Sequence, residues 1–323
     1  MTTGRMAFTL VLQYYGNVPK SSSDFKLLRY LFLNMVKIID GKKLADKIKD
    51  NIVKEIVRLN GGKDSKDMNR RPNLAIILIG DRDDSELYVS LKEKEAQKVG
   101  IDTHLYKCPK NITDQEVLEI VKCLNEDDSI DGILTQLPLP DSLDTDAIML
   151  AVDLKKDVDG FHPDNLEKLL KSCQIDCIMP PVFGTIIEML ESIDYNIDNK
   201  KVCIIANSDI FGKSLGQVLN CRGGKIVIVN PEEKDLVQKT KEADLLITAI
   251  GKPRFIKKGM IKKGVVIIDI GITKQGKKVY GDVDFEDVKE KASYITPVPG
   301  GVGPMTIAMA LKNTLEVYKS KYK

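Results

Sequence analysis

The sequence has no tryptophan, only two histidines and no cysteine pair spaced as C-x-x-C. Zinc sites are usually built from such cysteine pairs together with histidines, so we predict no metal site. All the cysteines lie in apolar stretches, which predicts buried, reduced thiols and a reducing compartment. They are Cys108, Cys123, Cys173, Cys177, Cys203 and Cys221.

The chain also lacks an excess of either charge. Its 49 basic residues face 47 acidic residues, a net charge of +2, which argues against a general nucleic-acid-binding surface. No uninterrupted apolar run approaches the roughly 20 residues of a membrane-spanning helix, so no membrane partner is predicted. A chain of 323 residues has room for about two domains.

The first 35 residues differ from the rest in composition. They carry four basic residues, a single acidic residue, Asp24, and three consecutive serines. This composition is compatible with an organelle transit peptide. A poorly ordered extension, or a mis-assigned start ahead of Met35, fits equally well. Localisation therefore stays open between the cytoplasm and an organelle, either mitochondrion or plastid.

From Lys37 onward, apolar runs that suit buried strands alternate with helix-like stretches, and Pro180 and Pro181 divide them into two series. This alternation implies βαβ units and mostly parallel sheets, hence two α/β domains. The predicted strands are 74–80, 103–108, 131–137, 202–206, 225–229, 244–251 and 264–271. The predicted helices are 84–99, 114–127, 143–152, 164–172, 182–193 and a long C-terminal one from residue 302.

Polar residues follow several strands of the first series. Tyr88 and Lys92 are four residues apart on one predicted helix and therefore share a face. Gln136 ends a buried strand, and Asp159 stands in a glycine turn, where its carboxylate could accept two hydrogen bonds from an amidine-like ring edge. A solvated charged helix is the alternative for Lys92, and a turn or capping role is the alternative for Asp159.

The second series begins with a strand, a turn and a helix, VCIIA-NSDIFG-KSLGQVL. This is the layout of a phosphate-binding loop, in which Ser208 could donate a hydroxyl group and Gly212 could allow close approach of the backbone. Because the G-x-G-x-x-G fingerprint is absent, an ordinary turn is an equal alternative. Gly251 lies in a turn of the kind that passes under a dinucleotide. The loop 295–306 could lie against a ligand or act as a hinge between domains.

These motifs together resemble the methylenetetrahydrofolate dehydrogenase/methenyltetrahydrofolate cyclohydrolase family. The resemblance spans Lys37 to Tyr318 and rests on YVSLKEKEAQKVGI, DGILTQLPLP, KDVDGFHP, GDV and ITPVPGGVGPMT in that order. It implies an N-terminal βαβ folate-binding domain (36–180 plus 298–323) and a doubly wound, Rossmann-like NAD(P)-binding domain (181–297). It also implies a C-terminal helix that packs back on the first domain, and a homodimer formed through the cofactor domain.

The resemblance implies roles for individual residues. Lys92 matches the catalytic lysine of a YxxxK motif with Tyr88 as its partner, Gln136 matches the glutamine that tunes this lysine, and Asp159 matches the carboxylate that holds the pterin. The folate would be flanked by Pro299, Gly300 and Gly301. The cofactor would be bound by Ala206, Asn207, Ser208, Gly212, Asn230, Gly251 and Ile272.

All departures from the family pattern fall on the cofactor side. The loop expected to read G-R-S-x-x-V-G-x-P begins Ala206-Asn207-Ser208, so Asn207 replaces the arginine that contacts a 2′-phosphate. Asn230 and Pro231 replace a histidine–serine pair. Val182 replaces a threonine expected near the nicotinamide. Asn230 followed by acids speaks mildly against a 2′-phosphate, although Lys213 and Lys234 leave the choice open.

The implied enzyme oxidises 5,10-methylenetetrahydrofolate to 5,10-methenyltetrahydrofolate with NADP, the family default, or NAD, and hydrolyses the product to 10-formyltetrahydrofolate. A lysine whose pKa is lowered by its surroundings would serve as base and acid in the hydrolysis. One alternative is a cyclohydrolase whose dehydrogenase activity is weak, lost or switched to NAD. A second alternative is a non-catalytic folate-binding protein.

Overall fold

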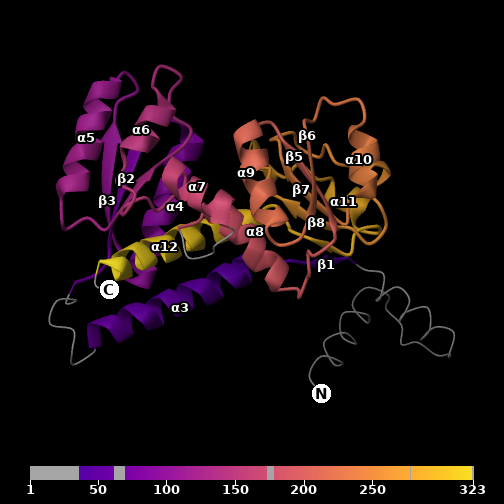
Figure 1. Ribbon diagram of the computed structural model, residues 1–323, viewed down its shortest axis with the longest axis horizontal. Coiled ribbons are helices and arrows are strands. Elements are labelled where there is room, and N and C mark those ends of the chain that lie inside the picture. The colour runs from indigo at the N-terminus through magenta and orange to yellow at the C-terminus, as the bar shows by residue number, and fades with distance from the viewer. Residues whose placement is uncertain (1–35, 62–69, 173–177, 277, 322–323) are drawn as a thin grey trace.

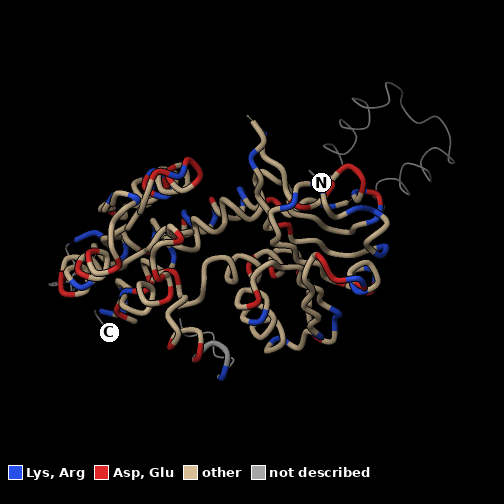
Figure 2. The backbone as a smooth tube through the Cα atoms, turned by 90° about the horizontal axis from the view of Figure 1, so that it is seen from above, with Lys and Arg blue, Asp and Glu red and all other residues tan. Residues whose placement is uncertain are grey.

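The computed structural model describes residues 36–61, 70–172, 178–276 and 278–321, so the prediction for the first 35 residues lies outside the described part. Two α/β lobes stand side by side, and two long helices run beneath them (Figure 1). No helix in the described ranges is long and apolar enough to cross a membrane. Basic and acidic residues are interspersed along the backbone of both lobes (Figure 2).

The first lobe is built on a three-stranded parallel sheet in the order β3-β2-β4. Its central strand is buried on both faces, as expected of a continuous apolar run. The strands are β2 (Asn73–Ile79), β3 (Asp102–Cys108) and β4 (Gly132–Thr135). The helices are α4 (Asp83–Val99), α5 (Asp114–Glu126), α6 (Thr145–Ala151) and α7 (Pro163–Ser172).

The second lobe contains a six-stranded parallel sheet in the order β1-β11-β8-β7-β5-β6. Its strands are β1 (Lys37–Ile38), β5 (Lys201–Ala206), β6 (Lys225–Val229), β7 (Leu245–Ala249), β8 (Val266–Asp269) and β11 (Tyr294–Ile295). Strands β9 (Thr273–Gln275) and β10 (Lys278–Tyr280) form a separate antiparallel hairpin. The start of the described chain thus joins the second lobe, because β1 pairs with β11.

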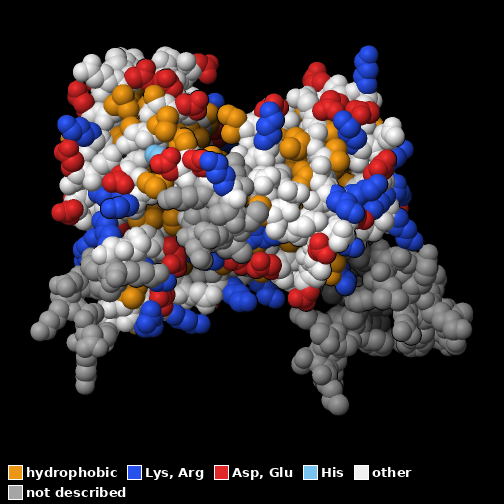
Figure 3. Space-filling view, in the orientation of Figure 1, with side chains coloured by type: hydrophobic (Ala, Val, Ile, Leu, Met, Phe, Trp, Pro, Cys, Tyr) orange, Lys and Arg blue, Asp and Glu red, His pale blue; other side chains and the backbone are white. Residues whose placement is uncertain are grey.

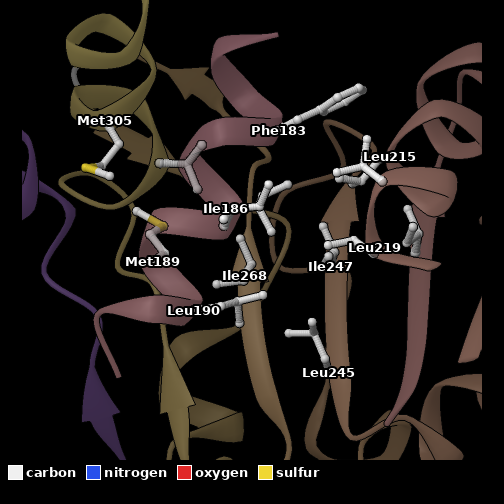
Figure 4. Close-up of a cluster of buried hydrophobic side chains, with 14 of the residues drawn as sticks. Phe183, Ile186, Met189, Leu190, Leu215, Leu219, Leu245, Ile247, Ile268 and Met305 are labelled. Carbon is white, nitrogen blue, oxygen red and sulfur yellow. The ribbon is translucent and has the colours of Figure 1, made fainter. Parts of the chain in front are cut away.

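The sheet of the second lobe is covered by helices. They are α8 (Pro181–Glu191), α9 (Asp209–Asn220), α10 (Leu236–Glu242), the 3₁₀ turn η1 (Lys258–Met260) and α11 (Phe285–Val288). Helix α8 lies between the sheet and the rest of the molecule. Figure 4 shows its Ile186 and Leu190 over Ile247 and Ile268 of the sheet, with Met189 turned toward Met305.

Helices α3 (Gly41–Gly61) and α12 (Val302–Ser320) join the two lobes. Helix α12 belongs to both hydrophobic cores. Met305 and Ala308 pack in the cluster that contains α8 and the second sheet, whereas Leu311 and Tyr318 pack in the cluster beneath the first sheet. The prediction that the C-terminal helix packs back on the first domain is confirmed, and this helix also fixes the first domain against the second.

The cysteine prediction is wrong in two places. Cys221 is disulfide-bonded, and Cys123 is exposed, whereas Cys108 and Cys203 are buried free thiols. Cys221 caps the C-terminus of α9 and Cys123 lies on the outer face of α5. An apolar neighbourhood in the sequence does not distinguish such surface positions from the core.

Candidate active site

The two lobes face each other across a hollow (Figure 3), and a cavity of about 450 Å³ lies where they meet. Tyr88 and Leu91 of α4 line one side of this cavity, and Ile272 and Val279 line the other. The loop 297–304, which leads into α12, completes its wall. Of the predicted site residues, Tyr88, Ile272, Pro299, Gly300 and Gly301 line this cavity, whereas Lys92, Gln136, Asp159 and the other predicted cofactor residues are not part of its lining.

Lys92 and Gln136 are brought together from different elements. The Nζ atom of Lys92 donates a hydrogen bond to Oε1 of Gln136 at 2.9 Å. Gln136 follows the end of β4, where its backbone N–H bonds Ile77 and its Nε2 donates to the carbonyl oxygen of Leu137 at 2.6 Å. Because the amide nitrogen is occupied in this way, the amide oxygen is the atom that faces the lysine.

A tight turn beside this pair holds Asp159. The neighbouring acid, Asp157, accepts hydrogen bonds from the backbone of Gly160 and His162, both at 3.0 Å, and from the side chain of Asn165 at 2.9 Å. Gly160 adopts a φ of +66°, which favours glycine. Asp157 therefore shapes the turn, and Asp159 is the acid left for a ligand.

Burial changes the acid–base properties of the pair formed by Lys92 and Asp159. Burial lowers the pKa of Lys92, and the charge of Asp159 partly opposes this change. Burial likewise raises the pKa of Asp159 to about 7, against the effect of Lys92 and with a further contribution from Asp157. Lys92 therefore loses its proton more readily than an exposed lysine, and Asp159 gains one more readily than an exposed aspartate.

Tyr88 lies one turn before Lys92 on α4. A Cβ atom placed on Gly303 would lie 3.8 Å from the Tyr88 hydroxyl oxygen and 3.8 Å from Cδ1 of Ile272. The tyrosine from the first lobe and the isoleucine from the second thus meet at the loop before α12. Burial, followed by the charge of Asp84, raises the pKa of Tyr88, which keeps its hydroxyl protonated as a hydrogen-bond donor.

The loop carrying Pro299, Gly300 and Gly301 is fixed against the start of α3. The N–H of Lys42 donates to the carbonyl oxygen of Gly300 at 3.0 Å. A Cβ atom on Gly41 would lie 1.9 Å from the carbonyl oxygen of Gly301, so only glycine fits there. Gly300 itself has a φ of +100°. The loop is therefore a rigid wall of the cleft.

The strand–turn–helix at the start of the second lobe has the predicted form. Ser208 is the N-cap of α9, and its Oγ accepts the N–H of Phe211 at 3.3 Å. The strand before it ends at Ala206, and the Nδ2 of Asn207 donates to the carbonyl oxygen of Ile250 at 2.7 Å. Gly212 is buried, and a Cβ there would lie 2.9 Å from Ile228 of β6, so its close approach is to the sheet.

Acids gather where β6 ends. The backbone N–H of Asn230 donates to Glu233 at 2.8 Å, and Glu233 also pairs with Lys239 at 2.6 Å. Glu232 pairs with Lys252 at 2.9 Å. At the neighbouring α9 terminus, Lys213 pairs with Asp209 at 3.0 Å. These lysines therefore already have carboxylate partners.

Two further predicted cofactor residues lie beyond β7 and β8. Gly251 has a φ of +66° in the turn after β7, and the hydroxyl of Thr273 donates to its carbonyl oxygen at 3.1 Å. Ile272 is exposed and lines the cleft. In the described ranges, no group of three or more His, Cys, Asp or Glu side chains could hold a metal ion.

A doubly wound lobe that faces a partly buried lysine, glutamine and aspartate defines a class of two-domain α/β enzyme. Two family models match this chain. The catalytic domain of tetrahydrofolate dehydrogenase/cyclohydrolase matches residues 39–159, and the NAD(P)-binding domain of the same family matches residues 180–322. The chain belongs to the tetrahydrofolate dehydrogenase/cyclohydrolase family, as the sequence predicted.

Relatives match over nearly their full length. The bifunctional protein FolD of Nautilia profundicola is 45% identical over 88% of this chain and 97% of its own. The FolD structure from Campylobacter jejuni has a TM-score of 0.83 at 38% identity and covers 88% of this chain and 99% of its own. The Trypanosoma brucei FolD structure, solved with NADP and an inhibitor, has a TM-score of 0.84 at 31% identity, covering 90% and 99%. The predicted fold class and enzyme class are confirmed, as is a nicotinamide cofactor.

Proposed function

We propose that this enzyme oxidises 5,10-methylenetetrahydrofolate and hydrolyses the resulting 5,10-methenyl compound to 10-formyltetrahydrofolate. The observation that carries the proposal is the hydrogen bond between Lys92 and Gln136, which lies beside the partly buried Asp159 in the first lobe. Full-length similarity to bifunctional FolD proteins supports both activities.

In the oxidation step, the carbon that bridges N5 and N10 of the folate would lose a hydride, for which a nicotinamide held by the second lobe would supply the acceptor. The resulting cation is stabilised by the two nitrogens, so the protein needs to supply orientation more than acid–base help. In this proposal, Asp159 accepts hydrogen bonds from the pterin, while Tyr88 and the loop at Pro299, Gly300 and Gly301 enclose the rest of the substrate.

In the hydrolysis step, water attacks the cationic carbon, and its proton must be removed before the ring nitrogen can leave. We assign this transfer to Lys92, because burial makes the neutral amine available as a base and the ammonium ion can then return the proton to the leaving nitrogen. Gln136 holds the Nζ atom in place and accepts a hydrogen bond from it in either protonation state.

The proposal is tested by Lys92→Met. Hydrolysis of 5,10-methenyltetrahydrofolate should fall by at least about a hundredfold, because general acid–base catalysis by a side chain contributes about that much, while folate binding is retained. Lys94→Met, an exposed lysine on the same helix, is the control and should retain full activity. Unchanged hydrolysis in Lys92→Met would refute the assignment.

For the cofactor, we propose a preference for NAD over NADP, with Ala206, Asn207, Ser208, Gly212, Asn230, Gly251 and Ile272 forming the site. Support comes from the strand tip, where Glu233 stands beside Asn230, since an acid at this point favours a free ribose 2′-hydroxyl. The side-chain amide of Asn207 already donates a hydrogen bond to the backbone of Ile250.

We expect Glu233→Ser to lower the ratio of kcat/KM for NAD to that for NADP, with Glu242→Ser as a surface control. A higher kcat/KM for NADP in the wild type would overturn the preference.

A cyclohydrolase with weak dehydrogenase activity is the second candidate. It is favoured by Val182 at the start of α8, which has no hydroxyl group where the family pattern has threonine. The purified enzyme should be given 5,10-methylenetetrahydrofolate with NAD or NADP, and 5,10-methenyltetrahydrofolate alone. Hydrolysis without cofactor reduction would select this candidate, whereas binding of folate with neither reaction would indicate a non-catalytic folate-binding protein.

We further propose a homodimer formed through the cofactor domain, with the domains divided as 36–180 plus 298–323 and 181–297. Strand β6 is at one end of the six-stranded sheet, and its Val227 and Ile228 are 40% and 37% exposed. An apolar, unpaired strand edge is a suitable surface for a second copy. Sedimentation of the wild type should show a dimer and that of Val227→Lys a monomer; a monomeric wild type would contradict the proposal.

A further inference from the structure

Two buried aspartates under the cofactor-side loops have not yet been given a role, although one of them, Asp269, is among the residues that line the cleft. Asp269 ends β8 and is 3% exposed, and Asp282 belongs to the GDV motif after the hairpin and is fully buried. Among the described residues, neither forms an ion pair within 4.0 Å with a basic side chain. Burying a carboxylate without a cation is costly, so its other contacts must compensate.

Asp282 holds the turn that follows β7. One carboxylate oxygen accepts the hydroxyl of Thr248 and the N–H of Ile250, both at 2.9 Å, and the other accepts the N–H of Lys252 at 2.9 Å. These donors lie on both sides of Gly251. A carboxylate can accept all of these hydrogen bonds at once, whereas an amide has a single acceptor oxygen.

Asp269 holds the segment that carries Asp282. It accepts the N–H of Gly271 at 3.0 Å, that of Asp282 at 3.1 Å and that of Val283 at 2.9 Å. Gly271 immediately precedes Ile272, which lines the cleft. The two carboxylates therefore organise three chain segments at the carboxyl ends of the strands, where doubly wound folds bind their ligands.

Two glycines make room for this arrangement. A Cβ atom on Gly271 would lie 2.1 Å from the Asp282 carboxylate, and one on Gly281 would lie 2.0 Å from the Asp269 carboxylate. Each aspartate thus fills the space that a side chain on the opposite segment would need. Burial raises the pKa of Asp282 and raises that of Asp269 to about 7. Burial therefore disfavours the charged form of both carboxyl groups.

We propose that Asp282, held by Asp269, is a positioning residue for the nicotinamide dinucleotide: it fixes the turn 250–252 and, through that turn, the residues that face the cofactor. Asn207 bonds the carbonyl oxygen of Ile250, and Thr273, next to Ile272, bonds the carbonyl oxygen of Gly251. Asp282 has no exposed surface, so its effect on the cofactor is indirect. This inference rests on the proposed dehydrogenase function.

The main test is Asp282→Asn, which keeps the shape of the side chain but turns an NH₂ group toward backbone N–H donors. The Kd for the dinucleotide, measured by fluorescence titration without folate, and its KM should both rise at least about tenfold. Cyclohydrolase activity, which uses no dinucleotide, should stay within about twofold of wild type. The control is Asp284→Asn, two residues along, whose carboxylate faces Lys257 and should leave Kd and KM unchanged.

Thr248 provides a milder pair of variants if Asp282→Asn does not fold. Thr248→Val removes one donor to Asp282 and should raise the dinucleotide Kd about threefold, whereas Thr248→Ser keeps the hydroxyl and should retain the wild-type value. Equal values for these two variants would overturn the proposal.

Two other outcomes would also overturn it. One is a dinucleotide Kd for Asp282→Asn equal to that of wild type. The other is a parallel loss of both activities together with a lowered melting temperature, because this would show a purely structural role. If the wild-type enzyme itself binds neither NAD nor NADP, the proposed dehydrogenase function fails first and this inference fails with it. That result differs from one in which the wild type binds the dinucleotide and Asp282→Asn binds it equally well, which would overturn only this inference.

Discussion

The two walls of the cleft are built in different ways. In the first lobe, the wall proposed to face the folate is backed by side chains, Lys92, Gln136 and Asp159, and burial lowers the pKa of Lys92 and raises that of Asp159. The opposite wall presents backbone turns, which two buried aspartates hold from behind. Proton transfer needs a titratable group at the substrate, whereas binding a dinucleotide needs a shaped backbone. The departures from the family pattern, Asn207, Asn230 and Val182, all lie in the second lobe.

The largest effect is expected from the variant Gln136→Leu, which tests the role of side chains on the folate-facing wall. Lys92 would lose its hydrogen-bond acceptor, so cyclohydrolase activity should fall about a hundredfold, within the range expected of a misplaced general base. Hydride transfer needs orientation alone and should fall by less than about tenfold. Steady-state assays of both reactions on the same preparation measure the split.

The matched control is Gln97→Leu, an exposed glutamine on α4, which should change neither rate. Equal losses in the two reactions of Gln136→Leu would mean that the glutamine positions the folate as a whole rather than the lysine.

The next largest effect is expected in the pH dependence of hydrolysis, through the ionisation of Asp159. Its pKa is raised to about 7, so in the free enzyme the carboxyl group takes up a proton as the pH falls through neutrality and ceases to accept hydrogen bonds from the pterin. The value of kcat/KM for hydrolysis should therefore decline below about pH 7, since this parameter follows ionisations of the free enzyme. In Asp159→Asn this acidic limb should move to lower pH, because only the protonation of Lys92 remains and the Asp159 charge no longer raises its pKa, and the plateau should be about tenfold lower.

Asp164→Asn, a change at the exposed start of α7, should keep the acidic limb and the wild-type plateau. If the limb persists unchanged in Asp159→Asn, another group is responsible for it, and the role of Asp159 in binding the pterin loses its support.

Much of the folate-facing wall follows from local sequence. The continuous apolar run at 74–80 becomes β2, and Gly100, with a φ of +83°, ends α4 as predicted. The spacing of Tyr88 and Lys92 places them on one face of α4. What the spacing cannot supply is the partner, because Gln136 is 44 residues away from Lys92 and the two meet only when β4 pairs with β2.

The structure of the cofactor-facing wall is harder to predict from the sequence, again because its contacts join residues that are distant in the sequence. Asp269 falls inside the predicted strand 264–271 and Asp282 follows Gly281, and neither position indicates the residues against which its carboxylate is buried. The hairpin β9–β10 is short and polar and has no periodic signal. The sequence of helix α3 does contain a periodic signal. Its Leu44, Ile48, Ile52 and Ile56 recur every four residues, a spacing that indicates a helix face.

The smallest expected effect tests whether the two walls are mechanically joined. Phe161, two residues after Asp159, contacts Phe183 of α8 with ring centroids 6.1 Å apart, and Phe183 contacts Phe211 of α9 at 5.6 Å. These rings connect the turn that carries Asp159 to the first turn of α9. Aromatic pairs at such distances contribute about 1 kcal/mol beyond the area they bury. In a double-mutant cycle of Phe183→Leu and Phe211→Leu, urea unfolding should give a coupling free energy of about 0.5–1 kcal/mol. The pair Phe161→Leu and Phe211→Leu shares only Phe183 as a neighbour and should couple more weakly. Strictly additive effects in both cycles would show that the rings fill space independently and that the walls are joined through α12 instead.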